Sequence, residues 1–155
     1  MSMLIRDAVR EAARFEQSLS ELYSLFHRTF PEDADLWWDL SISELGHANL
    51  LRAGARLFDS EFSREEIDGS VEALVRNNEE LESKLESFAE APLERAEAFR
   101  VALELESSTT EGMLHRLFET TASGRTRDLV NRITSEDQSH AELLRSYAEK
   151  AGLSL

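Results

Sequence analysis

The stretch HANLLR at residues 47–52 decides the fold, because it returns in nearly the same form as HAELLR at residues 140–145. A carboxylate stands three residues before the leading histidine of each copy, Glu44 in the first and Asp137 in the second. Residues three apart on an α-helix share a face, so each pair can direct an oxygen and a nitrogen at one point. Two such helices that face each other could enclose two metal ions.

Length and composition predict one helix-rich globular domain that spans residues 1–155. A chain of 155 residues can bury a core without disulfides or structural metal ions. Its content of 41% hydrophobic and 31% charged residues is typical of a folded protein. With only six glycines and two prolines, the chain has few of the residues that form turns, which favours long helices.

The charge balance excludes some classes of partner. With 31 acidic against 17 basic residues, the formal charge is -14, and such a surface repels nucleic acid and anionic membranes. The acidity could attract cations, or it could simply keep the protein soluble.

The chain contains no cysteine, which removes thiolate nucleophiles, cysteine-ligated zinc and iron-sulfur clusters. Any metal must therefore be held by oxygen and imidazole. No apolar run approaches the length of a membrane span, and charges interrupt the first residues where a signal peptide would be apolar. We expect a cytoplasmic protein without a membrane partner.

The spacing of apolar residues predicts two helical hairpins joined by a long connection that is itself largely helical. Pro31 and Pro92 mark helix boundaries, and Gly69 marks a joint within the connection. This connectivity is that of an all-α, ferritin-like four-helix bundle. The predicted helices span about Met3 to Thr29, Asp33 to Phe58, Ser63 to Glu90 (the connection), Leu93 to Thr121 and Arg127 to Lys150.

Aligning the two halves adds one glutamate from each remaining helix. AARFEQSLSE at residues 12–21 matches ALELESSTTE at residues 102–111, which places Glu16 opposite Glu106. Four carboxylates and two imidazoles are the ligand set of a di-iron or di-manganese carboxylate centre. The predicted ligands are Glu16, Glu44, His47, Glu106, Asp137 and His140.

The sequence resembles the rubrerythrin and ferritin-like di-iron family in four motifs that cover nearly the whole chain. They are FEQSLSELY (15–23), SELGHANLLR (43–52), LELESSTTE (103–111) and EDQSHAELLR (136–145). The resemblance implies two iron ions that oxidise from the ferrous state while peroxide or dioxygen is reduced, in a homodimer. Manganese would also accept this donor set.

Tyr23 is predicted to lie beside the metal ligands without binding metal itself. In the family the glutamate of the first helix is commonly followed by a tyrosine two turns on, and Glu16 and Tyr23 stand in that relation. Its hydroxyl could hold a ligand carboxylate or lie near the bound oxidant. Alternatively, it is a buried tyrosine whose hydroxyl merely finds a polar partner.

Three features depart from the family pattern. Asp137 replaces the usual glutamate, and Glu136, four residues before His140, could substitute for it. Thr109 and Thr110 stand where many peroxide-reducing members carry an additional glutamate, so a redox-linked exchange of ligands is not expected. Without cysteine there is no rubredoxin domain, and electrons would come from a separate donor protein.

Two other functions remain open at this point. The same centre could store or hand on iron without turning over another substrate, or the polar cluster could keep a structural bundle in register without metal. His27 and His115 do not align in the repeat and are predicted to be surface or packing residues. Of Trp37 and Trp38, one is expected in the core and the other on the surface, since adjacent positions of a helix point about 100° apart.

Overall fold

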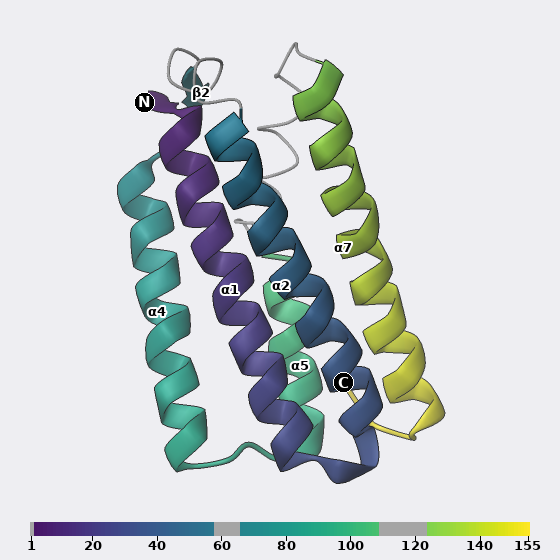
Figure 1. Cartoon of the computed structure of the whole chain (residues 1–155). Coiled ribbons are helices and arrows are strands. Elements are labelled where there is room, and N and C mark those ends of the chain that lie inside the picture. The colour runs from purple at the N-terminus through teal and green to yellow at the C-terminus, as the bar shows by residue number, and fades with distance from the viewer. Residues whose placement is uncertain (1, 58–65, 109–123) are drawn as a thin grey trace.

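The structure is a computed structural model that describes residues 2–57, 66–108 and 124–155. Helices make up most of this part, which confirms the all-α class (Figure 1). The elements are β1 (Ser2–Leu4), α1 (Ile5–Thr29), the 3-10 helix η1 (Pro31–Asp33), α2 (Ala34–Leu57), β2 (Glu66–Asp68), α4 (Val71–Glu90), α5 (Arg95–Glu106) and α7 (Gly124–Lys150).

Helices α1 and α2 form the predicted first hairpin and lie side by side along their lengths (Figure 1). Pro31 has no N–H to continue a helix, so α1 ends at Thr29 and the chain turns through η1. At the helix crossing, the hydroxyl of Ser20 donates to the carbonyl of Ser41 and that of Ser41 to the carbonyl of Ser20, both at 2.8 Å. A backbone carbonyl of the other helix thus satisfies each hydroxyl, and the short side chains let the two backbones approach closely.

The other helices surround this hairpin. Helix α4 packs along α1, α7 packs against both α2 and α5, and Figure 1 shows α5 behind the hairpin. Arg14 on α1 donates from two nitrogens to the two carboxylate oxygens of Glu82 on α4, each at 2.7 Å. The two helices that carry the HAxLLR repeat, α2 and α7, are therefore neighbours.

An aromatic cluster fills one end of the core. The ring centroid of Trp37 lies 4.8 Å from that of Phe99 and 5.0 Å from that of Phe26. Trp37 is fully buried whereas Trp38 is 51% exposed, which confirms the prediction for the adjacent pair. This core fixes the spacing of α1, α2 and α5 next to the buried polar residues described below.

The prediction of a helical connection is wrong at the beginning of that segment, where the structure has a short strand. Instead of continuing a helix, Glu66–Asp68 pairs as β2 with β1 in an antiparallel ladder in which Met3 opposes Ile67. Gly69 is therefore a break before α4 and not a joint within a helix: its φ is +153°, and a Cβ on it would lie 2.5 Å from Cε of Met3. Helix α4 starts after Ser70, whose hydroxyl accepts the N–H of Ala73 at 3.3 Å.

The helix predicted from Leu93 to Thr121 is shorter in the part of this segment that the structure describes. Helix α5 begins at Arg95 and ends at Glu106, where Ser107 leaves the helical region with φ -103° and ψ 10°. A pair of serines, which can hydrogen-bond the backbone in competition with a helix, follows Glu106. Residues 109–123, which hold the rest of the predicted helix, lie outside the described residues.

No helix within the described ranges combines the length and the apolarity that crossing a membrane requires.

Candidate metal centre

Four helices bring acidic and imidazole side chains together in the interior. Five of the six predicted ligands lie in this cluster, and each is at most 7% exposed. Charged groups are rarely buried to this extent without a compensating partner. They are Glu16 from α1, Glu44 and His47 from α2, Glu106 from α5 and His140 from α7.

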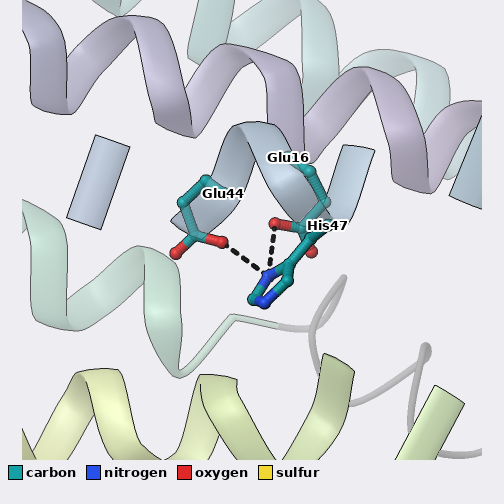
Figure 2. A group of neighbouring side chains, drawn as sticks. All are labelled: Glu16, Glu44 and His47. Carbon is teal, nitrogen blue, oxygen red and sulfur yellow. Dashed lines mark hydrogen bonds and ion pairs between the residues drawn. The ribbon is translucent and has the colours of Figure 1, made fainter. Parts of the chain in front are cut away.

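The first group consists of Glu16, Glu44 and His47 (Figure 2). Nδ1 of His47 lies 2.9 Å from Oε2 of Glu44, which is one turn earlier on α2, and 3.6 Å from Oε2 of Glu16. The i, i+3 spacing has placed an oxygen and a nitrogen of one helix together, as the sequence predicts. Helix α1, the other helix of the hairpin, contributes Glu16 as the third residue of this group.

The second group consists of Glu44, Glu106 and His140. Nδ1 of His140 lies 2.8 Å from Oε1 of Glu44 and 3.8 Å from Oε1 of Glu106. Glu44 thus belongs to both groups and presents a different oxygen to each histidine. In each group, one potential ligand atom per residue lies within 4.8 Å of the others, so either group could hold a metal ion.

The two histidines lie next to each other on facing helices. The ring centroids of His47 and His140 are 5.7 Å apart and the rings are nearly parallel, at 21°. Both rings turn Nδ1 toward the carboxylate of Glu44. The two groups are therefore adjacent parts of one site.

The electrostatics of Glu44 reflect this position. Burial by itself raises the pKa of the Glu44 carboxyl, but its contacts with His140 and His47 outweigh burial and hold the pKa below its usual range. The ionised carboxylate is the form that binds a metal. Glu44 is thus kept in its ligating form inside the protein.

The contact between Glu44 and His140 tests whether a cation fits. Oε1 of Glu44 and Nδ1 of His140 are 2.8 Å apart, yet neither makes a hydrogen bond of acceptable geometry within the described part of the chain. Buried polar atoms are normally satisfied by a hydrogen bond. A cation that contacts both atoms would take the place of the proton that otherwise lies between an imidazole nitrogen and a carboxylate oxygen, and these two atom types are a common donor set for such ions.

Tyr23 contacts the cluster through Glu106. Its hydroxyl donates to Oε1 of Glu106 at 2.6 Å, and both side chains are buried. The tyrosine therefore reaches from α1 to a carboxylate of α5 in the second group. Its ring packs against Trp37, with centroids 5.7 Å apart, which fixes the position of the hydroxyl.

Asp137, the sixth predicted ligand, lies within α7. The structure does not describe its side chain or that of Glu136. Thr109, Thr110 and His115 also lie outside the described residues.

His27 takes no part in either group. Its Nδ1 lies 2.9 Å from the carbonyl oxygen of Ala34, and its ring lies 5.4 Å from that of Trp38, at the end of the hairpin. This placement agrees with the prediction of a packing residue.

The shared role of Glu44 is the feature that the sequence did not predict. Its spacing pairs it with His47 alone, and the contact with His140 depends on how α2 and α7 pack. The only sequence signal that bears on it is the repeat itself, which implies that the two histidine helices face each other.

Comparisons of the chain with protein families, with curated proteins and with solved structures find no match. What the cluster can do therefore follows from its geometry and its donor set.

Proposed function

We propose that the chain is a single ferritin-like domain that holds a dinuclear centre, in the first instance two iron ions, and oxidises ferrous iron while reducing peroxide or dioxygen. One observation carries this proposal: the two oxygens of Glu44 face the Nδ1 atoms of His47 and His140, at 2.9 Å and 2.8 Å. A carboxylate placed in this way is suited to bridge two cations. The ferritin-like family resemblance of the sequence supplies the expected redox chemistry.

The residues divide between two metal positions. Glu16 and His47 would serve the first position and Glu106 and His140 the second, with Glu44 between them. Asp137, three residues before His140, is the proposed sixth ligand. Four carboxylates would offset the charge of two divalent ions, and the hard oxygen donors suit iron as well as manganese.

The bound ions would supply electrons to one oxidant, and the protein would control where this occurs. The five ligand side chains that the structure describes are at most 7% exposed, which limits the access of bulk water to them. Tyr23 holds Glu106 by its 2.6 Å hydrogen bond and keeps a proton on its hydroxyl beside the second position. Repeated turnover would require a separate electron donor protein, and we expect the protein to act as a homodimer.

The test begins with metal content. The purified protein, loaded with ferrous iron without oxygen, should bind two iron ions per chain, and adding peroxide should produce the absorption of oxidised iron. With a supplied reductant, continued consumption of peroxide would establish an enzyme. Stoichiometric oxidation of iron without turnover would establish iron handling instead. A protein that binds no added iron or manganese would contradict the proposal.

A further inference from the structure

A second site is indicated by a groove along the α1–α2 hairpin, separate from the buried cluster. Its volume is about 610 Å³, which lies within the range of about 300 to 1,000 Å³ for small-molecule sites. Two carboxylates, Glu21 of α1 and Glu82 of α4, also line it. Five arginines line it, although acidic residues outnumber basic ones 31 to 17 in the chain: Arg6, Arg10, Arg14, Arg52 and Arg56.

The arginines of the groove differ in how far they are already engaged. Arg14 is neutralised by its two 2.7 Å hydrogen bonds to Glu82. Arg52 donates to the uncharged amide oxygen of Gln17, at 3.1 Å. Within the described ranges, neither Arg52 nor Arg56 has a carboxylate within ion-pair distance. Because they are four residues apart on α2, their guanidinium groups share one face.

Across the groove, α1 contributes a further accessible cation. The side chain of Arg10 is 68% exposed, and it forms ion pairs with Asp7 at 3.4 Å and with Glu11 at 3.8 Å. Asp7, Glu11 and Glu82 offset the charges of Arg6, Arg10 and Arg14, so the charge that a bound anion would offset is that of Arg52 and Arg56. The planar guanidinium fork fits the paired oxygens of a carboxylate or a phosphate.

The floor of the groove is apolar. It consists of Val9 and Ala13 from α1 and Leu51 and Ala55 from α2. The two alanines are small, which leaves space between the helices, and the methylene stems of the arginines add apolar walls. A ligand that fills this space would need an apolar body as well as an anionic head.

We propose that the groove binds a small amphipathic anion, whose single carboxylate or phosphate head is held by Arg52 and Arg56 and whose apolar body lies over Ala13 and Ala55. A second copy of the chain fits less well, because a two-fold contact through this face would bring the arginines against themselves. An anionic membrane also fits less well, because the formal charge of -14 opposes approach to it.

Calorimetric titration of the whole chain with decanoate, decyl phosphate and uncharged decanol tests this proposal. Both anions should bind with one site per chain, and decanol should bind at least about tenfold more weakly, which corresponds to about 1.4 kcal/mol. The double substitution Arg52→Gln and Arg56→Gln should weaken both anions by at least about tenfold. The matched control, Arg28→Gln with Arg145→Gln, makes the same change in charge at exposed arginines outside the groove and should leave the affinities unchanged.

A separate experiment tests whether the groove binds the apolar body of the ligand. Ala55→Trp fills the groove without changing charge and should also weaken decanoate, and acetate should bind more weakly than decanoate to the unmodified protein. Equal affinity for decanol and decanoate, or unchanged affinity in either groove variant, would overturn the proposal. Binding to phosphatidylglycerol vesicles without binding of decyl phosphate would overturn it in favour of a membrane surface. Circular dichroism checks that each variant is folded.

Discussion

Oε1 of Glu44 on α2 lies 2.8 Å from Nδ1 of His140 on α7, so a carboxylate that the sequence pairs with His47 is shared with the histidine of the other repeat. The two histidine groups are therefore coupled through one residue. Substitutions in the cluster should differ in effect according to whether they touch one group or both.

Glu44→Gln should remove nearly all bound metal. Glutamine keeps the size of the side chain but loses the charge and one of the two oxygens that face the histidines. Metal content per chain, measured after loading with ferrous iron, should fall to near zero. The control Glu79→Gln changes an exposed carboxylate on α4 and should have no effect. If half of the metal remained in Glu44→Gln, Glu44 would serve only one group.

His47→Ala and His140→Ala should each lower metal content toward half. Each removes the imidazole of one group and leaves the other group complete. The matched control is His27→Ala, because His27 contacts Ala34 and Trp38 outside the cluster. Complete loss of metal in both single variants would mean that neither position binds alone.

The long helices were predictable where local signals agree. Pro31 ends a run of apolar residues with helical spacing, so the boundary between α1 and α2 followed from the sequence. The three-residue strands β1 and β2 are too short to carry a period of two, and they come from segments more than sixty residues apart in the chain. Such pairing between distant segments has no local signature.

The site was predictable in its residue types and not in its connections. The i, i+3 spacing and the internal repeat indicated buried carboxylates and histidines on facing helices, and five of them do lie together. Which oxygen faces which nitrogen depends on side-chain rotamers and on the contact between α2 and α7. For the same reason the hydrogen bond from Tyr23 to Glu106 could not be read from spacing along α1.

Tyr23→Phe should destabilise the protein without abolishing metal binding. The substitution removes the hydroxyl that donates to Glu106 at 2.6 Å and leaves a buried carboxylate oxygen without that bond. The expected loss in the free energy of unfolding is about 1 to 3 kcal/mol, measured by urea denaturation. Tyr147→Phe should cost less, because its hydroxyl lies 3.4 Å from a backbone oxygen in an exposed position. Equal costs would show that the buried bond contributes nothing specific.

The metal-free protein should lose stability in acid through Glu44. In the folded chain the pKa of this carboxyl lies below its ordinary value, since its contacts with His140 and His47 outweigh the opposing effect of burial. Its contribution is therefore complete above the unfolded pKa of about 4.3 and is lost as the pH falls from there through the folded pKa. The difference in unfolding free energy between the metal-free wild type and Glu44→Gln should be constant near neutral pH and should narrow steadily as the pH falls below about 5. A difference that stays constant would contradict the lowered pKa.

Removing metal should lower the thermal stability of the wild type more than that of Glu44→Gln. Carboxylates from α1, α2 and α5 converge within the two groups, and their mutual repulsion in a buried site is relieved by a bound cation. A ligand at about 100 times its dissociation constant stabilises the folded state by about 2.7 kcal/mol per site. Calorimetric scans with and without a chelator should therefore show a large shift in the melting temperature of the wild type and a small one in Glu44→Gln. Identical shifts in both proteins would mean that the metal binds elsewhere on the chain. Glu79→Gln is the control for the loss of one negative charge, and its shift should equal that of the wild type.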